Sequence, residues 1–409
     1  MIQVAVIDLQ PGMRLGTGVR DAEGRLLLGP GVALNWEYIG RLRDRGFHTV
    51  WVEDENTTDV LPEDNLTEVT RVRTMGAIRE AFAMTSEVGG ALKTESAEEI
   101  RKTLRSERFK KILQEHPAVE RLFAEVDRVV NEVLHRDVLT GLNSIRSRDA
   151  YTYHHCLDMT VTAIMIAQKL DFSRDRLQKL AVGCILHDIG KIFVDDEVLN
   201  KQGPLNPEEF KRMKDHTVLG YILLKENLRL GVLPPHIAYQ HHERQDGTGY
   251  PRGLKGSNRI PPPGRMVYAP GKITLMGEIA AIADFHDACC SDRPYRRGFP
   301  PDRVWNMIRE RAGTHFNKEI VDVFLSVLPV YPVGVQVIVT DGPHQGYRGV
   351  VTKVDPTALD LPVVRLLFDS RGRRIDPFEV DLRRDDATGI RCMVREDPML
   401  ALAEPDARD

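Results

Sequence analysis

The sequence has none of the signals of a membrane span, an exported protein or a binder of nucleic-acid polymers. No stretch approaches the roughly 18 uncharged apolar residues that cross a bilayer, and the N-terminus lacks the basic start of a signal peptide. The net charge is -4, from 56 basic and 60 acidic side chains, so a nucleic-acid polymer is not an expected partner. Five cysteines without zinc-type spacing favour a reducing, cytoplasmic location.

Length and periodicity predict several domains. At 409 residues the chain exceeds one typical core. Residues 1–60 combine strand-like runs with one helix-like stretch, so we expect a small α/β module. Residues 61–148 are expected to form a helical connector, residues 149–328 an all-α domain, and residues 329–409 a β-rich extension. The predicted fold class is multi-domain α+β with a central helical domain.

The connector carries a clear helical stripe. Apolar residues between Val119 and Leu134 recur at i, i+3, i+4 and i+7, the pattern of an amphipathic helix. Packing on the next domain accounts for this stripe. A homodimer seam that relays a signal accounts for it as well, so both interpretations stay open here.

Histidines and acids recur where apolar segments of the central domain end. His187 and Asp188 follow the apolar run Leu180–Leu186 and precede Gly190 and Lys191. Alone, this pair fits a metal site and a structural helix end equally well. The same pattern returns at His155, His216, His241, His242, Asp284 and Asp287. Buried charges are costly unless paired or metal-bound, and imidazole with carboxylate is a ligand set for Zn, Mn or Fe. The repetition therefore predicts a metal centre.

Six stretches of this domain resemble, in order, the motifs of the HD-GYP family, a branch of the HD-domain metal-dependent phosphohydrolases. They are Tyr151-Thr152-Tyr153-His154-His155, His187-Asp188-Ile189-Gly190-Lys191, Met213-Lys214-Asp215-His216, His241-His242-Glu243, Asp246-Gly247-Thr248-Gly249-Tyr250-Pro251, and Ile282 to Ala288 with Arg293-Pro294-Tyr295-Arg296. The resemblance implies a central HD-type fold and an enzyme of bacterial signal transduction. The implied reaction is hydrolysis of the second messenger cyclic di-GMP to pGpG, in some members on to GMP, by a hydroxide bound to two metals.

The resemblance also implies a role for each matching residue. Two divalent transition-metal ions (Fe, Mn or Zn) are expected on His155, His187, Asp188, His216, His241, His242 and Asp284. His155, His187, Asp188 and Asp284 would hold the first ion, and the other three histidines the second, with Asp188 as the bridge. Asp188 and Lys191 would be the catalytic pair, with Lys191 on the scissile phosphate. The implied substrate contacts are Lys191, Gly249, Tyr250, Pro251, Asp287, Arg293 and Arg296, although the two arginines also fit a solvated surface pair.

Some positions depart from the family pattern. Members with three metals carry a glutamate four residues before the first histidine, whereas this chain has Tyr151 there, so two metals are expected. An insert at residues 254–278, rich in proline and glycine, is placed to cover or reshape the site. Two alternatives therefore stay open: a cyclic di-GMP receptor or scaffold with little turnover, and a hydrolase of another cyclic dinucleotide or nucleotide phosphoester. Weak matches in both flanks suggest signalling protein partners without identifying the input.

Overall fold

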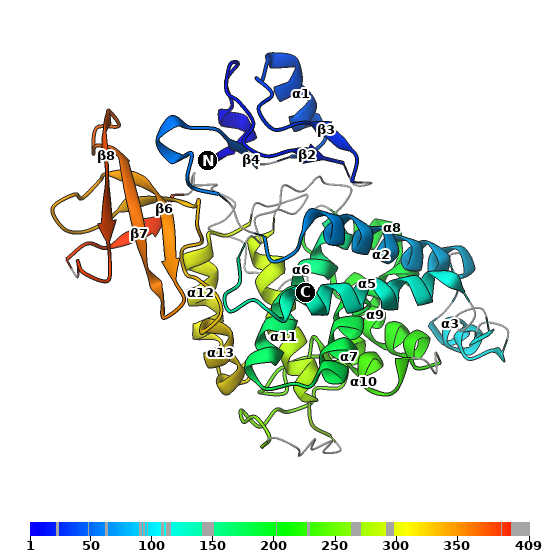
Figure 1. Ribbon diagram of the computed structural model, residues 1–409. Coiled ribbons are helices and arrows are strands. Elements are labelled where there is room, and N and C mark those ends of the chain that lie inside the picture. Colours follow the sequence, from blue (N-terminus) through cyan, green and yellow to red (C-terminus); the bar gives the residue numbers. More distant parts are fainter. Residues whose placement is uncertain are drawn as a thin grey trace.

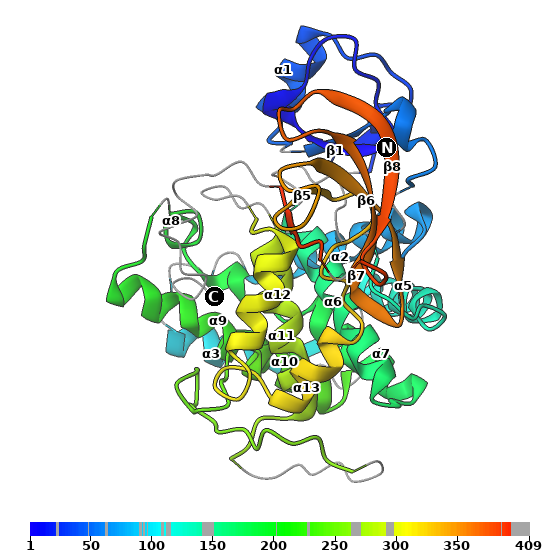
Figure 2. The ribbon, with the colours of Figure 1, turned by 90° about the vertical axis from the view of Figure 1, so that its left-hand side faces the viewer.

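The computed structural model describes residues 1–21, 24–47, 49–61, 64–89, 92, 95, 97–107, 110–111, 116–140, 151–201, 203–226, 230–262, 271–291, 298–385 and 387–393 (Figure 1). A helical body occupies the middle of the chain, and two small β-containing domains flank it (Figures 1 and 2). The predicted fold class, α+β with a central helical domain, is confirmed.

The N-terminal module is built on two short antiparallel sheets. Its elements are β1 (Ile2–Ala5), η1 (Val6–Asp8), β2 (Val19–Arg20), β3 (Leu26–Leu28), α1 (Trp36–Asp44), β4 (Thr49–Val52) and η2 (Glu55–Thr57). Strand β1 pairs with β4, in a register that sets Ile2 opposite Val52. Helix α1 begins where the Asn35 side chain accepts a hydrogen bond from the Tyr38 backbone N–H, the usual N-cap arrangement.

The helical body contains most of the chain. Its elements are α2 (Glu68–Gly89), α3 (Ala97–Leu104), α5 (Pro117–Val133), α6 (Tyr151–Lys169), α7 (Arg174–Ile185), η5 (Ile189–Phe193), α8 (Asp196–Leu199), α9 (Pro207–Lys225), α10 (Leu233–Gln240), α11 (Leu275–Cys290), α12 (Pro301–Glu310) and α13 (Lys318–Leu325). Helix α11 is buried on nearly every face, as expected of a helix that is apolar all round.

One hydrophobic core runs through this body and includes the predicted connector. Ile78 of α2 and Val126 of α5 belong to the same buried cluster as Ile164 of α6 and Ile282 of α11. The stripe predicted from Val119 onwards is thus buried against neighbouring helices of its own chain, which favours the packing interpretation. The core crosses the domain boundary predicted at residue 148, and the four predicted segments themselves stay a prediction.

The C-terminal domain is a five-stranded antiparallel sheet in the order β8-β7-β6-β5-β9. Its strands are β5 (Gln336–Val339), β6 (Arg348–Asp355), β7 (Ala358–Phe368), β8 (Arg374–Asp381) and β9 (Ile390–Cys392). The sheet contacts the N-terminal module, because Arg365 forms an ion pair with Asp59 at 2.6 Å and Gln336 donates a hydrogen bond to the Gln3 carbonyl. The two small flanking domains are therefore in contact with each other.

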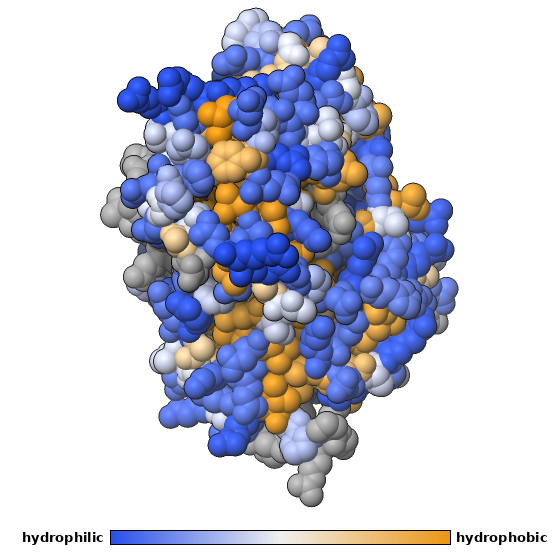
Figure 3. Space-filling view, turned by 60° about the vertical axis from the view of Figure 1, so that its left-hand side comes forward, coloured by the Kyte–Doolittle hydropathy of each residue, from blue (hydrophilic) through white to orange (hydrophobic). Residues whose placement is uncertain are grey.

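One face of the molecule is mainly polar (Figure 3). On the face in Figure 3, hydrophilic residues cover most of the area and hydrophobic residues form separate patches between them. Among the described helices, none combines the length and the apolar character that crossing a bilayer requires.

Candidate metal centre

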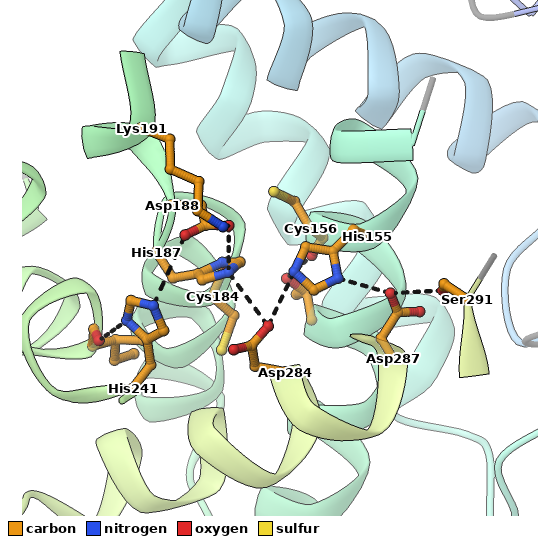
Figure 4. Close-up of polar contacts among 12 residues, drawn as sticks. His155, Cys156, Cys184, His187, Asp188, Lys191, His241, Asp284, Asp287 and Ser291 are labelled. Atoms are coloured by element: carbon orange, nitrogen blue, oxygen red, sulfur yellow. Dashed lines mark hydrogen bonds and ion pairs between the residues drawn. The ribbon is translucent and has the colours of Figure 1, made fainter. Parts of the chain in front are cut away.

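The predicted ligands come from five separate parts of the helical body and meet at one point. Figure 4 shows five of them, His155, His187, Asp188, His241 and Asp284. Helix α6 supplies His155, the turn after α7 supplies His187 and Asp188, α9 supplies His216, the end of α10 supplies His241 and His242, and α11 supplies Asp284. Each of these residues lies on or directly after an apolar helix that is anchored in the core.

A glycine allows the turn after α7 to approach α9. A Cβ atom on Gly190 would lie 2.0 Å from the His216 carbonyl oxygen and 2.6 Å from the Gly220 nitrogen. Only glycine therefore lets η5 pack directly on the backbone of α9. This close approach sets Asp188 beside His216 and leaves Lys191 over the same carboxylate.

Three of the imidazoles are oriented by main-chain carbonyl oxygens. Nδ1 of His187 lies 2.7 Å from the Cys184 oxygen, Nδ1 of His216 lies 2.6 Å from the Met213 oxygen, and Nδ1 of His241 lies 3.1 Å from the Ile237 oxygen. A carbonyl oxygen only accepts hydrogen bonds, so each Nδ1 must carry the hydrogen. In the neutral ring, Nε2 then directs a lone pair into the cluster.

These lone pairs face one another inside the protein. Nε2 of His216 and Nε2 of His241 are 3.4 Å apart. Nε2 of His187 and Oδ1 of Asp188 are buried without a hydrogen-bond partner in the described structure. Buried acceptors that converge in this way are stable only around a cation. The donor set therefore fits a bound transition metal, for which neutral imidazole and carboxylate are suitable ligands.

Asp188 lies between two groups of imidazoles. Its Oδ2 atom is 3.3 Å from Nε2 of His187, and its Oδ1 atom is 3.4 Å from Nε2 of His216 and 3.9 Å from Nε2 of His241. One oxygen thus faces each group, which is the position that a bridging carboxylate requires.

Asp284 faces the cluster from α11. Its Oδ1 atom lies 3.0 Å from Nε2 of His155 and 3.7 Å from Nε2 of His187. The ligand atoms form three overlapping sets, and within each set they lie within 4.8 Å of one another. The sets are His155 with His187 and Asp188, His187 with His241 and Asp284, and His216 with His241 and His242. The structure thus brings all seven predicted ligands together. The second set combines His187 and Asp284, which were predicted to hold the first ion, with His241, which was predicted to hold the second.

Burial and charge leave these groups in the protonation states that ligands need. Burial lowers the pKa of His216 to about 4, and burial together with His187 lowers the pKa of His241 to about 3, so both rings are neutral at pH 7. Burial alone would raise the pKa of Asp188, but Lys191 and His187 outweigh it and hold that pKa well below its usual range. The Asp188 carboxylate is therefore ionised.

Lys191 reaches the same carboxylate from the open side of the cluster. Its Nζ lies 2.6 Å from Oδ2 of Asp188, and the side chain is 30% exposed. The ammonium group is therefore available to an anionic ligand as well as to Asp188, consistent with the contact predicted for it.

Asp287 lies on the side of His155 that faces away from the cluster (Figure 4). Its carboxylate lies on the far side of His155 from Asp284 (Figure 4), with Oδ2 2.7 Å from Nδ1 of His155 and 3.1 Å from Oγ of Ser291. Only 1% of the residue is exposed. A buried carboxylate behind a ligand orients the ring and raises its basicity, so this position favours a positioning role over the predicted substrate contact.

The loop from Asp246 to Pro251 folds back onto the cluster. A Cβ atom on Gly249 would lie 2.5 Å from the His242 carbonyl oxygen, so glycine is needed there. The Tyr250 ring stacks on the His242 ring, with 4.6 Å between centroids and 26° between planes. Pro251 follows Tyr250 in the same loop. Thus Gly249 and Tyr250, two of the predicted substrate contacts, lie directly against a predicted ligand.

Glu243 was not assigned a role from the sequence, yet it fixes this loop. Its carboxylate accepts hydrogen bonds from the backbone N–H groups of Arg252 at 2.8 Å and Leu254 at 2.7 Å, and only 2% of the residue is exposed. The sequence signal that could have indicated this role is the position of Glu243 directly after the two candidate ligands His241 and His242.

Some predicted features lie outside the described residues. They are Arg293, Arg296, the side chain of Tyr151 and residues 263–270 of the insert. Residues Asn258 and Ile260 of the insert are held against the segment between α12 and the first turn of α13. Asn258 donates a hydrogen bond to the Gly313 carbonyl, and the Ile260 backbone N–H donates to Glu319.

Comparison with known proteins places the central domain in a class. Residues 130–320 match the family model of the HD domain. The predicted resemblance to HD-domain phosphohydrolases is confirmed.

Curated relatives narrow the comparison. The chain is 32% identical over 261 residues to a cyclic di-GMP phosphodiesterase of Pseudomonas aeruginosa, which covers 63% of this chain and 58% of the relative. It is 35% identical over 219 residues to a cyclic di-GMP phosphodiesterase of Thermotoga maritima, and this match covers 53% of this chain and 55% of the relative. It is also 31% identical over 189 residues to a 3′3′-cGAMP-specific phosphodiesterase of Vibrio cholerae, and this match covers 46% of this chain and 38% of the relative. The chain thus spans a little over half the length of the first two relatives.

Proposed function

We propose that the protein is a metal-dependent phosphodiesterase that hydrolyses cyclic di-GMP to pGpG. The observation that carries this proposal is the position of Asp188, whose two carboxylate oxygens face two groups of imidazoles while Lys191 contacts it from the open side. The names of the two relatives from Pseudomonas aeruginosa and Thermotoga maritima support cyclic di-GMP as the substrate.

The seven ligand candidates fit two divalent ions, with Asp188 between them. When bound, such ions supply Lewis acidity and lower the pKa of a coordinated water to near neutrality. Hydrolysis adds one water molecule across one P–O3′ bond, so that phosphorus gains an oxygen and the departing 3′ oxygen gains a proton. The metal's identity is one of Fe, Mn or Zn, since all three accept mixed imidazole and carboxylate ligation.

The side chains of the protein position and neutralise the reacting groups. Lys191 is placed to stabilise the negative charge that develops on the scissile phosphate. Asp287 holds His155 in the orientation that directs Nε2 into the cluster. Glu243 fixes the loop that keeps Tyr250 stacked on His242. A homodimer, protein partners of a signalling pathway and a cytoplasmic location stay predictions.

The test is metal analysis of anaerobically purified protein, followed by chromatography of its reaction with cyclic di-GMP. Asp188→Ala is expected to lower turnover by more than about a hundredfold, the upper range for residues that only support a ligand. The control is Asp175→Ala, which removes an exposed carboxylate from α7 that forms an ion pair with Lys179. Full activity of Asp188→Ala at full metal occupancy would contradict the proposal.

A second candidate substrate is 3′3′-cGAMP, because the relative from Vibrio cholerae is named for it. The same assay with both cyclic dinucleotides at equal concentration ranks them by kcat/KM. A receptor without turnover is distinguished by bound nucleotide that is recovered uncleaved from fully metal-loaded protein.

A further inference from the structure

We propose that Lys214 binds the second, non-scissile phosphate of the cyclic dinucleotide. This inference rests on the proposed function and adds a residue that the sequence motifs left without a role. It is carried by an aromatic and cationic cluster beside the metal centre, made of Phe210, Lys214 and Tyr250.

The cluster is joined directly to the predicted ligands. The Tyr250 ring stacks on His242 at 4.6 Å between centroids, and the backbone N–H of Tyr250 donates a hydrogen bond to the His242 carbonyl at 3.0 Å. His242 in turn packs edge-on against His216 at 5.2 Å. A molecule that touches Tyr250 on its open side is therefore next to the metal centre.

Helix α9 supplies the other two members of the cluster. The Phe210 ring meets the Tyr250 ring edge-on at 6.0 Å. Nζ of Lys214 lies 4.9 Å from the Phe210 centroid and 5.9 Å from the Tyr250 centroid. Both residues precede His216 on α9, so one rigid helix fixes the spacing between this ammonium group and the metal centre.

Lys214 keeps its positive charge available for a ligand. It is only half-buried, and within the described residues it forms no ion pair with a carboxylate. Lys191 differs in this respect, because Asp188 already lies 2.6 Å from its Nζ. Ring faces hold a lysine in place through cation–π attraction without neutralising its charge.

A cyclic dinucleotide presents two phosphodiester groups, and the metal centre with Lys191 accounts for one of them. The other needs a separate cation. An ammonium group is a compact point charge suited to phosphate, and its two aromatic neighbours reduce the side-chain entropy that binding would otherwise cost. Lys214 is the cation that the geometry assigns to this second phosphate.

The test compares Lys214→Met with Lys211→Met, which removes a charge from the exposed side of the same helix one turn earlier. For Lys214→Met, KM for cyclic di-GMP is expected to rise about tenfold, the effect of losing one charge-assisted hydrogen bond, with kcat nearly unchanged. KM for bis(p-nitrophenyl) phosphate, which has one phosphate only, is expected to stay constant. Lys214→Arg should retain most of the affinity, and Lys211→Met should match the wild type.

Each outcome decides between specific alternatives. Because the phosphates of cyclic di-GMP and 3′3′-cGAMP are identical, a phosphate contact predicts an equal rise in KM for both. A rise confined to cyclic di-GMP would mean that Lys214 reads a guanine base, and equal KM values for wild type and Lys214→Met would remove it from the site. Wild-type protein that cleaves bis(p-nitrophenyl) phosphate but neither binds nor cleaves a cyclic dinucleotide would overturn the proposed function and this inference together.

Discussion

Among the imidazoles of the cluster, His155 has an unusual partner. Its Nδ1 atom contacts a side-chain carboxylate, Asp287, whereas the Nδ1 atoms of His187, His216 and His241 contact main-chain carbonyl oxygens. A carboxylate polarises the ring more strongly than a carbonyl group does. The affinity of His155 for a metal ion therefore depends on a residue that mutation can remove.

At the residue scale, we expect Asp287→Ala to weaken metal binding by about 10- to 100-fold, the usual cost of losing a partner that orients a ligand. Asp287→Asn, which can still accept the Nδ1 hydrogen, should have a smaller effect. Metal affinity is measured by competition with a chelator. Ser291→Ala is the control, because it removes only the hydroxyl that contacts Asp287. Unchanged affinity in Asp287→Ala would remove its positioning role.

The pattern of histidines and acids at the ends of apolar segments pointed to a metal centre, and the resemblance to the HD-GYP motifs chose the seven candidate ligands, which the structure brings together. The sequence was not sufficient for Asp287. Asp284 and Asp287 are three residues apart and share one face of α11, so their spacing gives both the same direction. Only the packing of α11 against α6 sets one in front of His155 and the other behind it.

At the scale of elements, a buried glutamate ties three segments together. Glu278 lies in the first turn of α11 and accepts hydrogen bonds from the side-chain amides of Gln245 at 2.6 Å and Asn317 at 3.0 Å. Gln245 follows the His241-His242-Glu243 motif, and Asn317 caps α13. The network therefore holds the loop beside the metal centre to the helix that carries Asp284.

This network makes stability depend on pH. Burial raises the pKa of Glu278 from 4.5 to about 7, against the opposing hydrogen bonds of Gln245 and Asn317. Between these values the folded protein keeps a proton that the unfolded chain releases, so the free energy of unfolding falls as pH rises through this window and then levels off. The loss amounts to about 3 kcal/mol at pH 8.

Thermal unfolding of metal-free wild type and Glu278→Gln at pH 5 and pH 8 tests this prediction. The variant does not titrate at this position, so its stability relative to wild type should improve as the pH is raised. Glu310→Gln changes an exposed glutamate at the end of α12 and serves as the control. A difference between Glu278→Gln and wild type that is the same at both pH values would refute the assignment.

The helices themselves were predictable, but their contacts were not. Continuous apolar runs indicated that α7 and α11 are buried. The approach of η5 to α9 through Gly190 joins segments that are about 30 residues apart, and a glycine after a helix is as common at an ordinary turn. The burial of Glu278 was not predictable either. A glutamate in a helix is usually a charged surface residue, and only the fold places Gln245 and Asn317 against this one.

At the scale of the whole molecule, the connector helices α2 and α5 share one hydrophobic core with the ligand-bearing helices. Leu122, Val126 and Val129 of α5 are buried in the same cluster as the ligand-bearing helices. Arg71 of α2 also contacts buried Asp158 of α6 at 2.7 Å, one turn after His155. This ion pair ties α2 directly to the helix that carries His155.

We expect a fragment of residues 64–330 to fold and bind metal, and a fragment of residues 150–330 to fail. The shorter fragment exposes the apolar surface that α2 and α5 cover, at a cost of about 1.5–3 kcal/mol for each large side chain, against a typical total stability of roughly 5–15 kcal/mol. Circular dichroism and metal content of both fragments provide the measurement. A cooperative unfolding transition in the shorter fragment would show that the connector is dispensable.

The contact between the two ends of the chain could not be foreseen. Arg365 and Asp59 are 306 positions apart, and neither carries a local signal for the other. Composition and periodicity indicated two small flanking domains, but only the structure places the C-terminal sheet against the N-terminal module.

The carbonyl contacts of His187, His216 and His241 have a consequence for how this protein can change over generations. A main-chain carbonyl group is present whichever amino acid the gene encodes, so drift at Cys184, Met213 or Ile237 leaves the partner of each ring in place. Within the described cluster, Asp287 is the encoded partner of a ring nitrogen. A mutation at Asp287 can therefore remove the Nδ1 partner of a ring without changing any candidate ligand.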